Sequence, residues 1–523
     1  MSDCIVIGSG PSGAACAKAL IGCGRKVRML DAGLTLEPEK AEAVRTARAK
    51  VDMLRPETAP WLQASSTQPI ADIPRKLIFG SDFPYREADV HLRLHSEGVG
   101  LEPSFAFGGH SNIWGAAVMP YADRDIAGWP IGARDLAPHY EACARLLKFS
   151  AEEDDLVEDF PLYATPSGQV SASSQARSLL GTMSRNRARL AAQGVKFGRA
   201  RVAIRSSNSG EGCVYCGLCL SGCPDGLIFK TPPWIEGMAA DGRLDYQPNV
   251  VVETIREEGD VALVSAYDLH TRAPIEFRTK RLFVGCGPIA TTSILLRSGG
   301  LHGSAVRLKD SQYFLLPLLT MAAARNVADE RLHTLSQIFM EIVDNKIGDA
   351  TTHLQIYSYN SLIAAEVRRK LRGLDLLARP LLARLLLIQG YLHSDLSGGI
   401  DVMLEGSPGS DRIRLVPIVN PQTRPALGRV VRKLLGMTRL TAAMPVAMLL
   451  KVGEPGRGFH CGGSFPMSET PGSTETDTLG RPFGWQRIHA VDATVLPSIA
   501  ATTITFTVMA NAHRIGVNAS ALD

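Results

Sequence analysis

The sequence predicts an α/β protein, α+β overall, that is built from two interleaved domains. The chain has 523 residues, which is too long for a single compact core. It begins with a strand, a glycine-rich turn and a helix, and this style returns from Gly458 onward. Between these ends, residues 311–452 alternate apolar strands with longer helical segments, as expected of a second domain.

Composition and charge limit the possible classes of protein. The chain is 45% hydrophobic and 21% charged, which is ordinary for a globular protein, and its net charge of +4 gives no reason to expect nucleic-acid binding. The N-terminus lacks the pattern of a signal peptide, and no apolar run is long enough for a membrane span. Of the ten cysteines only those at 213–223 are clustered, unlike a secreted disulfide framework. We therefore predict a cytoplasmic protein.

The first element carries a dinucleotide-binding pattern. Gly8-x-Gly10-x-x-Gly13 follows a predicted strand and opens a predicted helix, and Asp31 comes directly after the next strand. The first glycine makes the turn, the second lets the backbone approach a pyrophosphate, and the third allows helix and strand to pack closely. The helix N-terminus favours the anion, and Asp31 is expected to bind the ribose hydroxyls. The pattern predicts a Rossmann-like unit, with an ordinary glycine turn as the alternative, and does not choose between FAD and NAD.

Further stretches decide the cofactor. They are GGHSNIWG at 108–115, GWPIGARDLAPHYEACARLL at 128–147, LFVGCGPIATTSILLRSG at 282–299, FHCGGSFPM at 459–467 and DTLGRPFGWQRIHAVDATVLPSIAATTITFTVMANAHRI at 477–515. Together and in this order they resemble the glucose–methanol–choline (GMC) family of FAD-dependent oxidoreductases. Within it, the chain is most similar to bacterial FAD-dependent sugar and alcohol dehydrogenases that carry a cysteine-rich loop. Residues 301–450 match poorly, as expected of a substrate-specific part.

The resemblance implies a domain organisation and a set of FAD contacts. It implies a discontinuous FAD-binding domain, made of 1–125, 200–300 and 455–523, and a substrate domain of 126–199 and 301–454 on an antiparallel sheet with helices. Gly108 and Gly109 would let the backbone pass close to the planar flavin ring, although these two glycines alone would also suit an ordinary tight turn. The implied FAD contacts are Gly108, Gly109, Asn112, Trp114 and Ala116 near the isoalloxazine, Val251 near the adenine, and Asp492 and Ala493 near the phosphates or ribityl chain.

Two residues are candidates for catalysis. His460 stands where the family carries its catalytic histidine, and its ordinary pKa suits removal of a hydroxyl proton near neutral pH. A lone histidine can also be purely structural. The family's second His or Asn is replaced by Thr503, which can donate or accept a hydrogen bond but cannot act as a base. We expect His460 to act largely alone, with Thr503 holding the substrate hydroxyl.

The cysteine-rich loop is a candidate metal site. Cys213, Cys216, Cys219 and Cys223 are followed by proline and match the bacterial ferredoxin run, although only one run is present. An iron–sulfur cluster of the 3Fe-4S or 4Fe-4S type, a loop without metal and a zinc site are all compatible with this pattern. A cluster would make the enzyme a dehydrogenase that passes electrons on singly.

These patterns predict oxidation of a CH–OH group of a sugar or other alcohol by hydride transfer to FAD, with electrons relayed through the cluster to an external protein or quinone acceptor. Two alternatives stay open. The basic, leucine-rich stretch 367–392, expected to be helical, suggests a hydrophobic or lipid-linked alcohol at a membrane surface, although it is also compatible with a helix that covers the domain core and breaks at Pro380. The loss of the second family residue at Thr503 suggests a non-catalytic flavin electron-transfer subunit.

Overall fold

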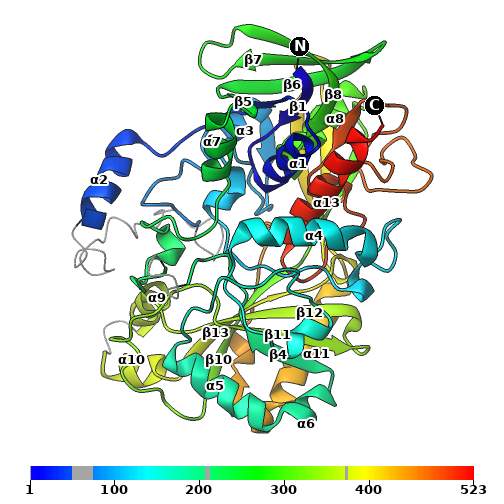
Figure 1. The fold of residues 1–523 in the computed structure, drawn as a ribbon. Coiled ribbons are helices and arrows are strands. Elements are labelled where there is room, and N and C mark those ends of the chain that lie inside the picture. Colours follow the sequence, from blue (N-terminus) through cyan, green and yellow to red (C-terminus); the bar gives the residue numbers. More distant parts are fainter. Residues whose placement is uncertain (1, 50–74, 207–211, 372–374, 523) are drawn as a thin grey trace.

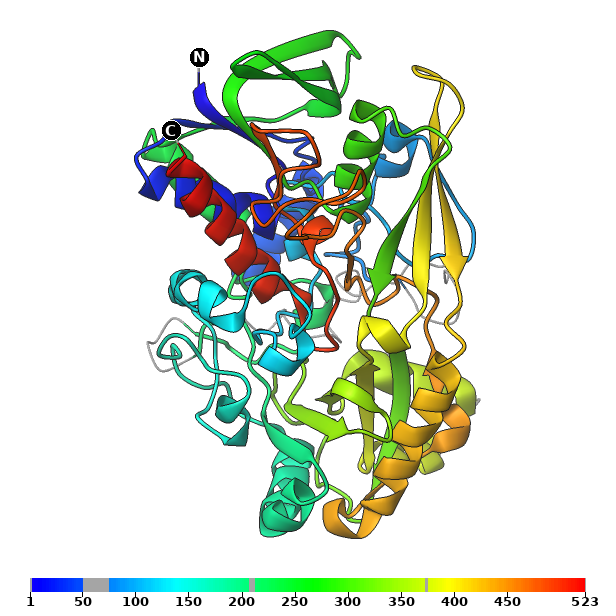
Figure 2. The same cartoon turned by 90° about the vertical axis from the view of Figure 1, so that its right-hand side faces the viewer.

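The computed structural model describes residues 2–49, 75–206, 212–371 and 375–522, and it confirms the predicted fold class. Two large sheets lie at opposite ends of the molecule, and a third sheet runs between them (Figures 1 and 2). The boundaries predicted for the two domains stay a prediction, and the sheets are described by their strands below.

The first sheet is the Rossmann-like one. Its strands are β1 (Ser2–Ile7), β2 (Val27–Leu30), β5 (Leu244–Gln247), β6 (Val250–Glu258), β7 (Val261–Asp268), β8 (Pro274–Val284) and β19 (Ile488–Ala490). The order is β5-β2-β1-β8-β7-β6, and β19 pairs with β8. Strand β1 lies between β2 and β8 and is parallel to both. Its CIVI run is buried on both faces, as is typical of a central parallel strand.

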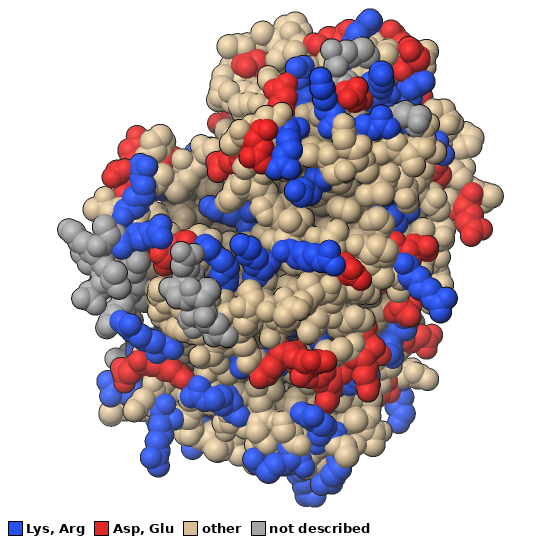
Figure 3. Space-filling model, in the orientation of Figure 1, with Lys and Arg blue, Asp and Glu red and all other residues tan. Residues whose placement is uncertain are grey.

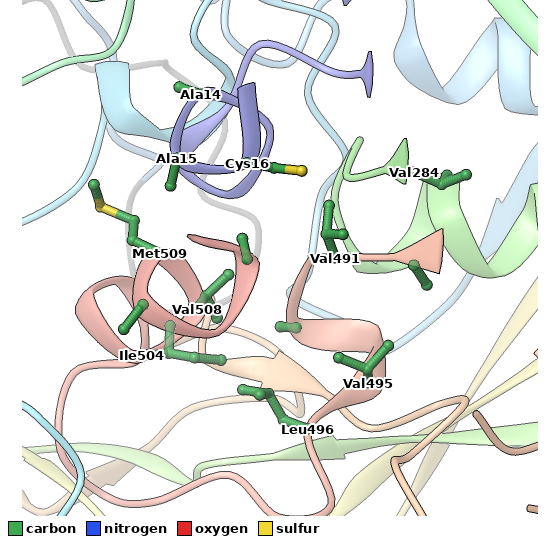
Figure 4. Packing of buried hydrophobic residues seen from close by; sticks show 14 of the residues in the cluster. Ala14, Ala15, Cys16, Val284, Val491, Val495, Leu496, Ile504, Val508 and Met509 are labelled. Carbon is green, nitrogen blue, oxygen red and sulfur yellow. The ribbon is translucent and has the colours of Figure 1, made fainter. Parts of the chain in front are cut away.

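Two helices from opposite ends of the sequence pack together beside this sheet. Helix α1 (Pro11–Gly22) follows the glycine turn, with proline at its first position. Helix α13 (Ile504–Ser520) lies against it, and Ala15 and Met509 lie between the two (Figure 4). Small residues permit this close approach, because a Cβ added at Gly516 would stand 3.0 Å from the Cβ of Ala19.

The second sheet is antiparallel throughout. Its order is β16-β10-β13-β12-β11-β4, and β17 pairs with β10. The strands are β4 (Val195–Arg199), β10 (Tyr313–Thr320), β11 (Ile338–Asp344), β12 (Gly348–Tyr357), β13 (Leu385–Tyr391), β16 (Ala443–Pro445) and β17 (Lys451–Val452). One face packs into an apolar core with α5 (Ser174–Arg185) and α11 (Thr423–Gly436). The other face carries the alternate residues of each strand, since side chains alternate across a sheet.

The third sheet connects the other two. It has the order β18-β9-β14-β15-β3, formed by β3 (Leu94–Ser96), β9 (Ala305–Asp310), β14 (Gly399–Glu405), β15 (Arg412–Ile418) and β18 (Cys461–Gly462). Pairing of β18 with β9 places residue 460 directly beside this sheet. The remaining helices are α2 (Pro38–Ala49), α3 (Ala88–Leu92), α4 (Ala133–Leu147), α6 (Arg187–Ala191), α7 (Pro232–Ala240), α8 (Pro288–Ser298), α9 (Ser361–Leu371), α10 (Asp375–Leu382) and α12 (Thr438–Thr441).

The stretch 367–392 departs from its prediction as a helical segment. Helices α9 and α10 occupy its first part, with residues 372–374 outside the described ones, and Pro380 lies within α10. Residues 385–391 are instead strand β13, because Leu386 and Ile388 enter the sheet core and pairing with β10 and β12 overrides helix propensity. None of the helices in the described part of the chain has the length and apolar character needed to cross a bilayer. Both signs of charge occur over the upper and lower parts of the face in Figure 3. Peripheral membrane contact stays a prediction.

Candidate functional site

A cavity runs along the edge where β1 ends and α1 begins. The predicted glycines shape its floor: Gly8 has a φ of +98°, and a Cβ at Gly13 would overlap the carbonyl oxygen of Gly8. Gly10 lines the cavity and has no other atom within 4 Å of the place a Cβ would take. The three glycines therefore serve the turn, an open approach and close packing, as the sequence pattern predicts.

Asp31 lines the same cavity and is tied to the glycine turn. Its Oδ2 accepts hydrogen bonds from Ser9 Oγ at 2.5 Å and from Tyr246 OH at 3.0 Å. Burial raises the pKa of Asp31 to about 7, and these hydrogen bonds only partly oppose that shift. Ser9 Oγ also accepts the backbone N–H of Gly108 at 2.8 Å, so one hydroxyl links the first motif to the GGHSNIWG loop. Sequence reasoning missed this serine.

The GGHSNIWG loop contributes to the cavity only in part. Gly109 lines it, and a Cβ there would stand 3.5 Å from Gly10 Cα. The side chains of Asn112 and Trp114 are engaged elsewhere: Asn112 Nδ2 donates to the carbonyls of Phe107 and Gly109, and Trp114 Nε1 donates to Phe229 O. These bonds hold the shape of the loop.

Two other predicted contacts in this loop lie off the cavity wall. Gly108 has a φ of +87° beside the ring of Pro232, and Ala116 is fully buried with a φ of +57°. The described residues that line the cavity include neither of them, nor Asn112 or Trp114. Their proposed contact with the flavin stays a prediction.

The remaining predicted contacts do line the cavity. Val251 lies on one wall, and Asp492 and Ala493 lie on another. Asp492 Oδ2 accepts the backbone N–H of Gly287 at 2.9 Å and the hydroxyl of Thr291 at 2.5 Å. Burial raises the pKa of Asp492, and these donors oppose the rise. The carboxylate thereby fixes the turn after β8 at the cavity edge.

The chain fits an extended dinucleotide such as FAD. Gly10 and Gly287 both line the cavity, and nothing lies within 4 Å of a Cβ added at either glycine. The absence of a side chain at these two glycines therefore leaves room for a ligand in the cavity. Residues of the turn before α1, Asp31, Val251, Asp492 and Ala493 would hold it.

His460 is not among the described residues that line this cavity, but it is adjacent in sequence to two that do. Its two neighbours in sequence, Phe459 and Cys461, both line the cavity. The imidazole stacks on the ring of Tyr391, with centroids 4.6 Å apart and an angle of 20°. Burial, and to a lesser degree the charge of His353, lowers the pKa of His460 to about 3. The imidazole is therefore neutral near pH 7, and its pKa lies well below the ordinary value on which the prediction of a base near neutral pH is based.

Thr503 is buried and is the residue that precedes α13. Its Oγ accepts the backbone N–H of Met119 at 3.2 Å, which leaves its hydroxyl proton to donate. The hydroxyl is thus already used in part to fix the loop that contains Met119.

The polar face of the second sheet was missed by sequence reasoning. Glu341 on β11 and His353 on β12 form a buried pair, with His353 Nδ1 and Glu341 Oε1 2.6 Å apart. The available signal was a single acid within the apolar run IFMEIV and a histidine within THLQIY. Only the strand register shows that the two meet.

The cysteine loop does not form a metal site in this structure. All ten cysteines are described and free, and among the described residues no group of three or more His, Cys, Asp or Glu side chains is placed to hold a metal ion. Burial raises the pKa of Cys213 and of Cys216 to about 12. The sulfurs of Cys213 and Cys223 accept backbone N–H groups of Tyr215 and Leu227. The predicted iron–sulfur cluster, with Cys216 and Cys219 as further ligands, is therefore unsupported, and we derive no step through one.

Comparisons with known proteins show a similarity of fold. No family model matches the chain, and no curated protein matches it. Among solved structures, pyridoxine 4-oxidase from Mesorbium loti is similar, with a TM-score of 0.61, 15% sequence identity, and 99% of each chain covered. The chain therefore shares the fold of that oxidase over almost its whole length.

Proposed function

We propose that the protein is an FAD-dependent oxidoreductase of the GMC type, which oxidises the CH–OH group of a sugar or another alcohol. One observation carries this proposal: His460 stands between two residues that line the same cavity as the glycine turn and Asp31. A candidate base is thus directly adjacent in sequence to the wall of a cavity suited to a dinucleotide. The shared fold with pyridoxine 4-oxidase supports the assignment.

The chain supplies the proton chemistry of this reaction. FAD, when bound, accepts the hydride from the substrate carbon. His460 takes the hydroxyl proton, because its imidazole is neutral and its Nδ1 has no hydrogen-bond partner among the described residues. Stacking on Tyr391 holds the ring, and the backbone N–H of Ser311 donates to His460 O at 3.0 Å, which fixes the main chain.

The electrons leave to an external acceptor, for which a protein, a quinone and molecular oxygen are the candidates. Purification without oxygen followed by assays of iron and acid-labile sulfide separates them. Stoichiometric flavin without iron favours direct transfer to oxygen or to a soluble acceptor. Iron and sulfide bound together would restore the ferredoxin-like role of the cysteine loop.

His460→Ala tests the function. We expect the rate of flavin reduction by an alcohol to fall by about 10²- to 10⁴-fold, while the bound flavin retains its visible absorbance. Anaerobic stopped-flow spectroscopy with a panel of alcohols measures it. His139→Gln is the matched control, because His139 pairs with His513 at 2.9 Å away from the cavity. An unchanged rate in His460→Ala would remove this residue from its role, and a wild-type flavin that no alcohol reduces would contradict the proposed function.

A further inference from the structure

One face of the second sheet carries a row of polar side chains that leads to His460. Strand register pairs Glu341 with His353, His353 with Tyr391, and Tyr391 with Tyr313. Directly paired residues of antiparallel strands project on the same face. The four side chains therefore cross four neighbouring strands in a line. Their neighbours along each strand face the apolar core on the opposite side.

The row contains a buried pair whose hydrogen-bonding capacity is incompletely used. Glu341 is 2% exposed and His353 is fully buried. Glu341 Oε1 is bonded to His353 Nδ1, but neither Glu341 Oε2 nor His353 Nε2 has a hydrogen-bond partner among the described residues. Leaving a buried polar group unpaired is energetically unfavourable. A site that keeps this cost in its free state is suited to a ligand that removes it.

The geometry of the imidazole decides where the unused hydrogen bond points. The two ring nitrogens flank Cε1 and point outward in widely divergent directions, so Nε2 of His353 is directed away from Glu341. If Glu341 is ionised, Nδ1 donates to it and Nε2 accepts; if Glu341 is protonated, the roles reverse. In both cases Nε2 can form one further hydrogen bond, as an acceptor in the first case and as a donor in the second. Asp125, Arg201 and the ring of Tyr391 also face this pair.

The pair lies near the proposed reaction centre. The ring of Tyr391 stacks on His353, with centroids 6.1 Å apart, and on His460, with centroids 4.6 Å apart, so the two histidines share one aromatic neighbour. Tyr391 also packs with Tyr313 and Ala501, which is two residues before Thr503. The row therefore meets the segment that leads into α13.

We propose that His353, oriented by Glu341, hydrogen-bonds a second polar group of the substrate, so that the enzyme selects alcohols that carry another hydroxyl besides the one oxidised. This inference rests on the proposed function and names the substrate class of that site. His353 and Thr503 would then share the task of holding the substrate, while His460 handles the proton. Glu341 acts through His353 and is a positioning residue.

Matched pairs of alcohols test the inference on the flavin-loaded protein. The probes are cyclohexanol against the isomeric cyclohexanediols, and benzyl alcohol against the isomeric hydroxybenzyl alcohols and pyridoxine. For each, kcat and KM of flavin reduction are measured with a dye acceptor. We expect wild type to prefer the best dihydroxy probe by about 10-fold or more in kcat/KM, as one hydrogen bond of about 1.4 kcal/mol allows.

The variants separate recognition from structure. In His353→Leu we expect the preference to fall to about one, mainly through KM, whereas His353→Gln, which keeps a hydrogen-bonding end, retains part of it. Glu341→Leu combined with His353→Leu removes both partners and so leaves no unpaired carboxylate if the single variant fails to fold. Glu341→Gln keeps an acceptor for Nδ1 and should retain most of the preference. His139→Gln should match wild type.

The outcomes distinguish the two proposals. A lost preference with flavin still reduced by the monohydroxy probe supports the inference. Equal losses on both members of each pair, or an unchanged preference in the double variant, would overturn it and leave the proposed function standing. If no probe reduces the wild-type flavin, the proposed function fails, and the inference fails with it.

Discussion

The two large sheets place polar groups in different ways. At the edge of the parallel sheet, the carboxylates of Asp31 and Asp492 are each bonded to hydroxyl or backbone donors from the protein. On the antiparallel sheet, the pair of Glu341 and His353 leaves one atom of each without a partner in the described part of the chain. In the first region the protein itself supplies hydrogen-bond donors to both carboxylates around the cavity. In the second region two buried side-chain atoms still lack a hydrogen-bond partner among the described residues. We infer that the edge of the parallel sheet holds a cofactor and that the polar face of the antiparallel sheet recognises the substrate.

The largest effect on stability is expected at the close backbone contact between Gly13 and Gly8. In Gly13→Ala the added methyl would overlap Gly8 O, and neither segment can move without disturbing β1 or α1. We expect the free energy of unfolding to fall by about 5 kcal/mol or more, with loss of bound flavin. Urea denaturation and flavin content measure this. Gly22→Ala, at the exposed end of the same helix with nothing near its added Cβ, should change stability by less than about 1 kcal/mol. Equal effects of both variants would contradict the close packing.

Asp31 should give the cofactor-free protein a distinct dependence on pH. Its pKa rises from 3.8 to about 7 on folding, so the folded state binds the proton more tightly than the unfolded state does. The resulting stability is fully present below the unfolded pKa and is lost as the pH rises towards 7, at about 1.4 kcal/mol per pH unit and about 4 kcal/mol in total. Asp31→Asn should lack this component. Urea denaturation of both proteins across this range measures the difference, and parallel curves would show that Asp31 is not responsible.

The polar row should respond to single and double changes in opposite ways. His353→Leu leaves the buried Glu341 without its partner, and we expect a loss of about 3 kcal/mol in the free energy of unfolding. Leucine at both positions should lie within about 1 kcal/mol of wild type, because neither member of the pair is then left without the other. A double-mutant cycle in urea gives the coupling energy. A double variant as unstable as the sum of the singles would mean that the pair contributes no specific interaction.

The smallest effect is expected at the outer end of the row. Lys196 on β4 is paired in register with Glu341, but its ammonium group bonds Glu158 at 2.8 Å and Asp159 at 2.7 Å near the surface. Lys196→Gln should cost less than about 1 kcal/mol, as surface ion pairs do, and should leave the preference between probe alcohols unchanged. A changed preference would extend the recognition row beyond Glu341.

The sequence revealed the first region because its function depends on local spacing. Gly8, Gly10 and Gly13 lie within six residues of each other, so one turn of chain displays the whole pattern. The position of Asp31 could be predicted as well, because it comes directly after the second strand of the same βαβ unit. By contrast, the finer assignment of Asn112 and Trp114 to the flavin did not anticipate that their side chains bond to the protein itself.

The second region could not be read in the same way. Glu341 and His353 meet only because β11 and β12 pair in one register, and a shift of one residue would send both to the opposite face. The stretch 385–391 shows the same limit, because its leucines suit a helix equally well until strands β10 and β12 flank it. The cysteine spacing is a local pattern too, yet spacing alone did not determine how the thiols are arranged.

The cavity joins parts of the chain that a ribosome makes far apart in time. Gly8 and Asp31 emerge first, whereas Ile504 and Val508 of α13, which line the same cavity, emerge after nearly all the rest. The nascent βαβ unit can form early, but its open side stays exposed until α13 is released. The proposed cofactor site is therefore completed only when α13 has been released. A premature stop codon anywhere before α13 yields a polypeptide that lacks this wall, however much of the remainder has folded.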